Sequence, residues 1–169
     1  MSPEFPYQLV AFFDKSPEIG EGVYQGEKGW YPQLTVKRRF TYVDAIEDMV
    51  IEKIREFFAT IKPITVVTGG LEQPERMPVR VLPIINSDEL KDLHLKFIAH
   101  MGEKMHSRFP ERDGENYMPH ITAEYGGKFV IDVGEYSHAT FTITSVCLIK
   151  DRDDGDSQVV TFIPIGMNK

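Results

Sequence analysis

A histidine and a threonine two residues apart form the part of this chain whose residue types could do chemistry. His120 and Thr122 lie in segment 117–125 (YMPHITAEY), whose composition is typical of a β-strand. Side chains alternate between the two faces of a strand, so the imidazole of His120 and the hydroxyl of Thr122 point the same way. A titratable ring beside a hydroxyl on a rigid strand makes half of a site that could handle phosphate.

A related pattern occurs earlier in the chain. Segment 31–36 (YPQLTV) repeats the order of segment 118–123 (MPHITA): a bulky residue, proline, a polar residue, a branched apolar residue, threonine, and a small or branched apolar residue. Two such strands could line a cleft between two similar lobes. By the same alternation, Lys37 and Arg39 share a face with Gln33 and Thr35, which would add positive charge to that cleft.

On these residues the chain resembles the two-histidine (2H) phosphoesterase superfamily, which includes the 2′-5′ RNA ligase-like proteins and cyclic nucleotide phosphodiesterases. That family carries two H-x-[ST] motifs, usually preceded by proline, in a bilobal α+β fold. The second motif, from Pro119 to Thr122, matches fully, but Gln33 stands where the family has its first histidine. The resemblance spans nearly the whole length. It implies a metal-independent phosphoesterase without a cofactor, acting on a cyclic phosphate or a 2′-5′-linked nucleotide or RNA end.

The resemblance also assigns roles to individual residues. One acid/base group, two hydroxyls that hold phosphate oxygens, and the altered first position would make the catalytic set: His120, Thr35, Thr122 and Gln33. A cationic contact and three rings that could stack on a base would bind the substrate: Lys37 or Arg39, with Tyr125, Tyr31 and Tyr117.

Glutamine cannot exchange a proton near neutral pH, so Gln33 leaves the chemistry open. Losing one general acid or base typically costs roughly 10²–10⁴ in rate. The protein could retain weak hydrolysis through His120, or another group could have taken over the missing role: Lys37, His94, His106 or His138. Alternatively, the chain is a non-catalytic nucleotide- or RNA-binding module, or Gln33 was introduced in place of a natural histidine. RNA-end processing and degradation of cyclic oligonucleotide signals both fit the sequence.

Length and composition indicate a single α+β domain over residues 1–169. The resemblance implies two mainly antiparallel sheets lining a central cleft, with helices packed outside. The net charge of −7 argues against a broad surface for nucleic acid, and the single cysteine, Cys147, has no disulfide partner within the chain. We find no signal peptide and no apolar run long enough to span a membrane. We therefore expect a cytoplasmic monomer.

Hydrophobic periodicity and breaker residues predict the elements that must position the two motifs. Asp44 should cap a first helix, whose apolar stripe runs from Ile46 to Ile61. Ser87 should cap a second helix, whose apolar stripe runs from Leu90 to Met105. His94 is expected to be structural and His100 exposed. Loops are expected at 14–29 and 107–116, a hairpin turn at Asp-Asp-Gly-Asp (153–156), and no assignment is made for 129–140. Strands are expected at 7–13, 33–40, 64–68, 79–85, 117–125, 141–150 and 158–165.

Overall fold

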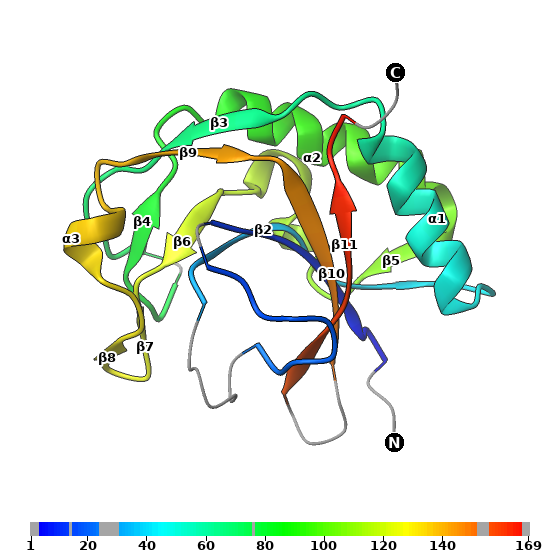
Figure 1. Ribbon diagram of the computed structural model, residues 1–169, viewed down its shortest axis with the longest axis horizontal. Coiled ribbons are helices and arrows are strands. Elements are labelled where there is room, and N and C mark those ends of the chain that lie inside the picture. Colours follow the sequence, from blue (N-terminus) through cyan, green and yellow to red (C-terminus); the bar gives the residue numbers. More distant parts are fainter. Residues whose placement is uncertain (1–3, 14, 24–30, 76, 152–155, 167–169) are drawn as a thin grey trace.

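The computed structural model describes residues 4–13, 15–23, 31–75, 77–151 and 156–166. A seven-stranded sheet runs through the centre in the order β11-β10-β1-β2-β6-β4, and β5 also pairs with β2 (Figure 1). Its pairings are antiparallel, so the expected α+β class with mainly antiparallel sheet is confirmed. The strands of this sheet are β1 (Tyr7–Phe12), β2 (Gln33–Tyr42), β4 (Val81–Pro83), β5 (Met105–Ser107), β6 (His120–Thr122), β10 (Ser145–Asp151) and β11 (Ser157–Pro164).

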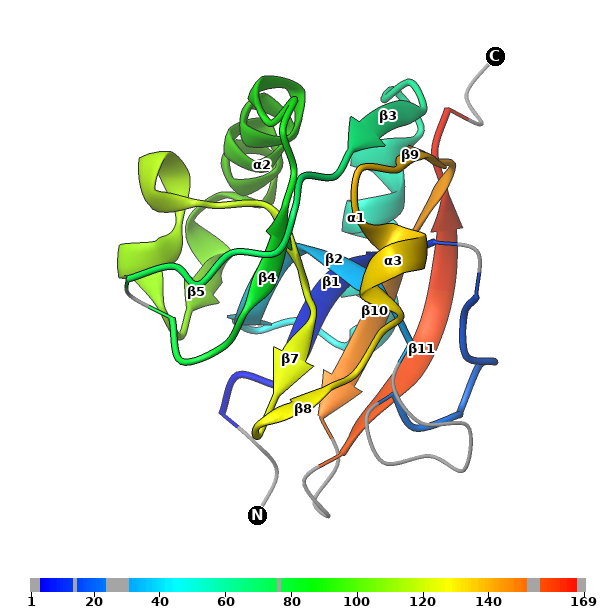
Figure 2. The ribbon, with the colours of Figure 1, turned by 90° about the vertical axis from the view of Figure 1, so that its left-hand side faces the viewer.

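Two shorter sheets and the helices complete the described part of the fold. The shorter sheets pair β3 (Ile64–Val67) with β9 (Thr140–Ile143), and β7 (Glu124–Tyr125) with β8 (Lys128–Phe129). Helices α1 (Glu47–Phe58) and α2 (Asp88–Met101) lie together on one face of the central sheet (Figure 2). The remaining turns of helix are α3 (Val133–Tyr136) and three 3₁₀ segments, η1 (Gly102–Lys104), η2 (Pro110–Arg112) and η3 (Gly114–Asn116).

The sheet has an apolar core on each face. Leu9, Leu34 and Phe40 alternate toward the helices and join the buried residues of α1 and α2 there. Val10, Cys147 and Ile149 point to the other face, where they pack with Val23 of the segment that follows β1. This alternation decides which polar side chains can meet on the face away from the helices.

The first helix differs from expectation at its start. Ile46, not Asp44, occupies the N-cap position, and no side chain caps the helix. Asp44 has a φ of +57°, a left-handed conformation that belongs to the preceding turn rather than to a cap. Ile46 and Met49 are consequently exposed, although they fit the apolar period, while Val50, Ile54, Phe57 and Phe58 form the buried stripe.

Ser87 does occupy the N-cap position of α2, but its side chain makes no capping hydrogen bond. Met105 lies beyond this helix, in β5, because Gly102 with a φ of +76° ends α2 and turns the chain. His100 is half-buried rather than exposed, and one of its ring nitrogens lies 2.8 Å from the carbonyl oxygen of Lys53 on α1.

The remaining predictions concern strand lengths. The strand expected at 117–125 is split into β6 and β7, and the one at 141–150 into β9 and β10. The strand expected at 79–85 shortens to β4, and of the remaining residues only Ile84 makes a bridge, an isolated one with Thr68. The expected loop at 107–116 contains η2 and η3, and the unassigned stretch contains α3. Residues 153–155 of the expected turn and residues 14 and 24–29 of the expected loop lie outside the described residues.

Candidate active site

The two motif strands are hydrogen-bonded neighbours. We expected them to face each other from two lobes, but β2 and β6 pair antiparallel in one sheet, with Leu34 opposite Ile121. Continuing this register by one residue sets Gln33 beside Thr122 and Thr35 beside His120. Leu34 and Ile121 are fully buried, so the four polar side chains project from the opposite face.

These four side chains form a compact array. Directly opposed residues of antiparallel strands have their Cβ atoms roughly 4.5–5.5 Å apart, which lets one small anion contact all four. Gln33 is 7% exposed, and the other three residues are half-buried. The array offers an imidazole, two hydroxyls and a carboxamide on one rigid surface.

The ring of His120 is fixed in one orientation. Its Nδ1 lies 2.7 Å from the carbonyl oxygen of Met118, and since a carbonyl only accepts, Nδ1 carries the hydrogen. Burial lowers the pKa of His120 from 6.5, the bond to Met118 opposes this, and the charges of Arg38 and Arg112 lower the pKa further. At neutral pH, Nε2 is therefore unprotonated, and its lone pair can take a proton.

Gln33 has an unusual environment for a buried amide. Its Oε1 is buried and accepts no hydrogen bond from any described residue. Leaving a buried acceptor without a donor costs about 1–3 kcal/mol, and such groups are rare in native structures. The buried amide oxygen of Gln33 is thus an acceptor without a donor among the described residues.

Lys37 does not share this face, contrary to expectation. Two register shifts between β1 and β2 add residues to β2, and Lys37 comes to lie opposite Leu9, which points into the helix-side core. Lys37 is 1% exposed, and its Nζ donates to Asp113 at 3.0 Å and to the carbonyl oxygen of Arg38 at 3.2 Å. Burial lowers the pKa of Lys37, and Asp113 partly opposes that effect.

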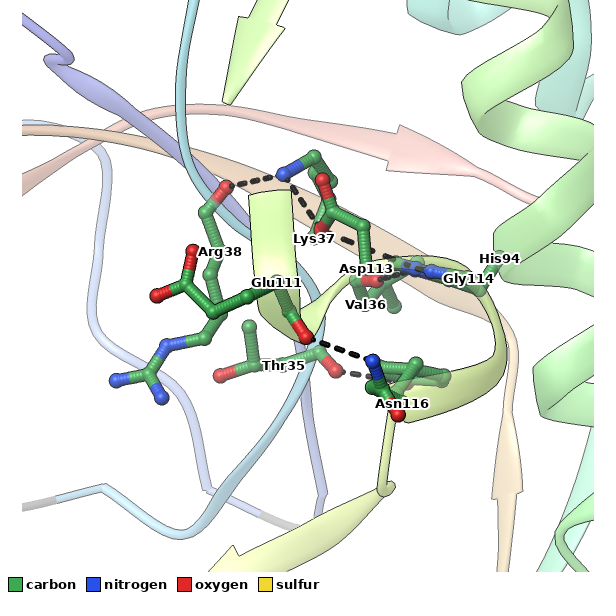
Figure 3. Close-up of polar contacts among 10 residues, drawn as sticks. Thr35, Val36, Lys37, Arg38, His94, Glu111, Asp113, Gly114 and Asn116 are labelled. Carbon is green, nitrogen blue, oxygen red and sulfur yellow. Dashed lines mark hydrogen bonds and ion pairs between the residues drawn. The ribbon is translucent and has the colours of Figure 1, made fainter. Parts of the chain in front are cut away.

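Arg38 takes the position expected for Lys37. Figure 3 shows the guanidinium of Arg38 and the hydroxyl of Thr35 on the same side, away from α2, whereas the Lys37 amine turns toward Asp113. Arg39 forms an ion pair with Asp151, at the end of β10, so its charge is balanced there. Sequence reasoning missed Arg38 because simple alternation does not anticipate a bulge.

Two of the three tyrosines are not available for stacking on a base. Tyr31 and Tyr117 are each 7% exposed. The hydroxyl of Tyr31 donates to Glu21 at 3.1 Å, and that of Tyr117 donates to the carbonyl oxygen of Thr35 at 2.8 Å. Tyr125 is 61% exposed on the β7–β8 hairpin.

The histidines considered as substitutes for the missing one lie elsewhere. His94 is on the helix side, where its Nδ1 donates to the carbonyl oxygen of Val36 at 2.9 Å and its Nε2 accepts from Gly114 at 3.1 Å. This pattern confirms a structural His94, held neutral with Nδ1 protonated. His106 is exposed opposite Thr41, and His138 lies against Gly70.

A cavity of about 220 Å³ lies beside Phe12, the cross-strand partner of Gln33, and none of the four array residues lines it. Its walls are phenyl rings and hydroxyls from four parts of the chain: Phe12, Phe13, Ser16, Thr142, Thr144, Ser145 and Phe162. Within the described ranges, no three His, Cys, Asp or Glu side chains gather as a metal site. No described helix is long and apolar enough to cross a membrane.

The sequence matches no protein-family model and no curated protein. Solved structures are nevertheless similar over almost the whole chain. A phosphoesterase crystal structure is 13% identical, with a TM-score of 0.57, over 95% of this chain and 97% of that chain. E. coli LigT in its apo form is 13% identical, with a TM-score of 0.53, over 95% of this chain and 98% of that chain. E. coli LigT complexed with NADP+ is 16% identical, with a TM-score of 0.50, over 95% and 99%.

The chain has the fold of the LigT-like phosphoesterases. The resemblance read from the two motifs is thereby confirmed at the level of the fold. In this fold the motif strands β2 and β6 are adjacent, which explains how two segments far apart in sequence present one array of side chains.

Proposed function

We propose that this chain is a metal-independent phosphoesterase that acts on a cyclic phosphate or a 2′-5′-linked nucleotide or RNA end. The observation that carries the proposal is the array of Gln33, Thr35, His120 and Thr122 on one sheet face, where no described residue bonds Nε2 of His120. The fold shared with a phosphoesterase supports it, and the NADP+ complex of LigT supports a nucleotide as the ligand class.

In this proposal, water attacks the phosphorus of a 2′,3′-cyclic phosphate while Nε2 of His120 takes a proton from that water. The bond from phosphorus to one ribose oxygen breaks, and that oxygen takes a proton from solvent. The hydroxyls of Thr35 and Thr122 donate to the non-bridging oxygens, and Arg38 offsets their negative charge. His120 then returns its proton to solvent, which leaves a phosphate monoester and a free ribose hydroxyl.

Gln33 makes this enzyme slow rather than inert. Its amide can hold the departing oxygen or a neighbouring hydroxyl, but it cannot protonate them. A missing general acid reduces the rate by roughly 10²–10⁴, so turnover remains measurable above the uncatalysed reaction.

The test is turnover of a panel of 2′,3′-cyclic nucleotides by wild type and His120→Ala. We expect slow opening of the ring by wild type and none above background by the variant. Absence of turnover by wild type, or equal rates for the two proteins, would rule out catalysis at His120.

A second function, binding without conversion, is favoured by Oε1 of Gln33, which accepts no hydrogen bond from any described residue. A buried acceptor without a donor suits a ligand-binding site, whether or not a reaction follows. Calorimetry with non-cleavable nucleoside monophosphates tests this function. Tight binding by wild type without any turnover would favour it, and absence of binding would remove it.

A further inference from the structure

Three arginines surround a single phenyl ring in the loop that leads to β6. The guanidinium carbons of Arg38, Arg108 and Arg112 lie 5.6, 5.2 and 5.6 Å from the centroid of the Phe109 ring. Such distances allow a cation–π attraction of about 0.5–1 kcal/mol each at exposed sites. The Phe109 ring is thus a contact that all three guanidinium groups share. We call these four residues the arginine cluster.

The arginine cluster is fastened to the sheet by its backbone and its neighbours. The N–H of Arg108 donates to the carbonyl oxygen of Arg39 at 3.0 Å, which ties the start of the loop to β2. Asp113, one residue after Arg112, binds the buried Lys37, and Asn116 donates to the carbonyl oxygen of Glu111 at 2.9 Å. The guanidinium groups are thus carried on a preorganised loop.

The cluster adjoins the array of the candidate active site. Arg38 follows Thr35 by three residues on β2, and its guanidinium lies on the side of the Thr35 hydroxyl (Figure 3). Arg38 and Arg112 are also the two cations whose charge acts on His120. Three guanidinium groups therefore gather beside the second motif, on a loop that also carries Glu111, Asp113 and Glu115.

Arginine suits phosphate because its planar fork donates two parallel hydrogen bonds to phosphate oxygens. In the proposed function, Arg38 is the cation that contacts the phosphate at the array. Arg108, just before η2, and Arg112, the last residue of η2, are two further cations at the same ring as Arg38.

We propose that Arg108 and Arg112 form a subsite for a second phosphate of the same ligand. Phe109 contacts the two arginines, and Arg38 lies between the subsite and the array. The inference rests on the proposed function, since the first phosphate is the one held by the array. The subsite selects a ligand with a phosphate one linkage from the reacting phosphate. That phosphate can be the internal phosphodiester of an oligonucleotide or a terminal phosphate on a mononucleotide.

The test compares three ligands that share one 3′-terminal phosphate: a nucleoside 3′-monophosphate, the same nucleoside carrying an additional 5′-phosphate, and a dinucleotide with an internal phosphodiester. Dissociation constants are measured by calorimetry for wild type, Arg108→Gln, Arg112→Gln and the matched control Arg55→Gln. Arg55 is an exposed arginine on α1, paired with Glu52 and remote from the cluster in the fold.

We expect the additional phosphate to tighten binding to wild type by about tenfold or more, as one charge-assisted contact allows. Arg108→Gln and Arg112→Gln should remove that gain and leave the dissociation constant of the monophosphate within about twofold of wild type. Arg55→Gln should keep the gain. Whichever two-phosphate ligand gains more identifies the source of the phosphate. Equal affinity of wild type for all three ligands, or an equal loss for all three in the cluster variants, would overturn the subsite.

These outcomes are separate from the failure of catalysis. Turnover of a cyclic mononucleotide tests the proposed phosphoesterase, whereas the three-ligand comparison uses ligands that do not react. If the protein shows no turnover but still binds the two-phosphate ligands more tightly, the subsite stands and the proposed phosphoesterase activity is ruled out.

Discussion

The hydroxyl of Tyr117 donates to the carbonyl oxygen of Thr35 at 2.8 Å, across 82 residues of sequence. The ring of Tyr117 also stacks on His94, with centroids 4.0 Å apart and planes 11° from parallel. Tyr117 thus binds the loop before β6 to the strand that carries the first motif. We infer that these contacts help hold the two halves of the array in register, and Tyr117 itself is only 7% exposed.

Tyr117→Phe keeps the stacked ring and removes the hydroxyl, which leaves the carbonyl of Thr35 without its donor. We expect a loss of about 1 kcal/mol in the free energy of unfolding, because a buried acceptor loses its partner. Ligand affinity should fall as well, since Thr35 is no longer held. Urea denaturation and calorimetry measure the two effects. Tyr42→Phe is the control, because the Tyr42 hydroxyl makes no hydrogen bond with any described residue. An equal effect of both changes would contradict the positioning role.

Gln33→His restores the group that the second motif already has. We expect the rate of ring opening of a 2′,3′-cyclic nucleotide to rise by roughly 10²-fold or more, since a general acid or base typically contributes that much. The gain should vanish in Gln33→His combined with His120→Ala, and Gln33→Leu should show none. A Gln33→His protein as slow as wild type would mean that Gln33 does not occupy the first-histidine position.

The pKa of His120 should lie below 6.5 and should depend on Arg38. Burial and the nearby positive charges disfavour the imidazolium, so removal of one charge in Arg38→Gln should raise the pKa toward its ordinary value. The activity of His120 as a base should accordingly fall as pH drops through that pKa. Titration of the His120 ring signals by NMR measures it, with Arg55→Gln as the control. A pKa above 6.5 in wild type would contradict this account.

Asp113→Asn should destabilise the protein far more than the loss of a surface ion pair. It leaves the ammonium of Lys37, which is 1% exposed, without its counter-ion, and such a change typically costs about 3–5 kcal/mol. Lys37→Met combined with Asp113→Asn should recover most of that loss. Asp92→Asn breaks the exposed pair with Lys96 and should cost about 1 kcal/mol at most. Equal urea midpoints for Asp113→Asn and Asp92→Asn would disprove the buried pair.

The stability of the protein should also decline in mild acid because of His94. Its folded-state pKa is lowered from 6.5 by burial, with Val36 and Asp113 opposing, so the unfolded chain takes up the proton first. The free energy of unfolding is therefore unaffected above pH 6.5 and falls as pH drops below it. Protonation also removes the acceptor for the N–H of Gly114. Urea denaturation between pH 5 and about pH 7 should show a shallower slope for His94→Asn in a His120→Ala background than for His120→Ala alone.

Much of the architecture could be predicted because the core elements follow simple periodicity. Leu9, Leu34 and Ile121 alternate with residues of the other face, and Val50, Ile54 and Phe57 recur at helical spacing. The proline and threonine of each motif located both strands, so Gln33, Thr35, His120 and Thr122 could be grouped without a structure. The expected grouping of these four is what the register of β2 and β6 produces.

The failures occur where one extra residue or a tertiary contact overrides local pattern. The bulges in β2 exchange Lys37 for Arg38, which alternation cannot foresee. Tyr31 and Tyr117 are covered by residues distant in sequence, so aromatic rings beside a motif did not remain exposed. The cluster around Phe109 assembles from β2 and a loop 70 or so residues later, a spacing that carries no sequence signal.

The pairing of β2 with β6 has a consequence for how the protein folds. Bringing residues together across such a long stretch of chain is slow, because the entropy of closing the loop must be overcome before the contacts form. No early intermediate made only of local hairpins can contain both halves of the array. A ligand that contacts both strands therefore binds only the native state. It will slow the hydrogen exchange of those amides that exchange by global unfolding, and its binding will report that folding is complete.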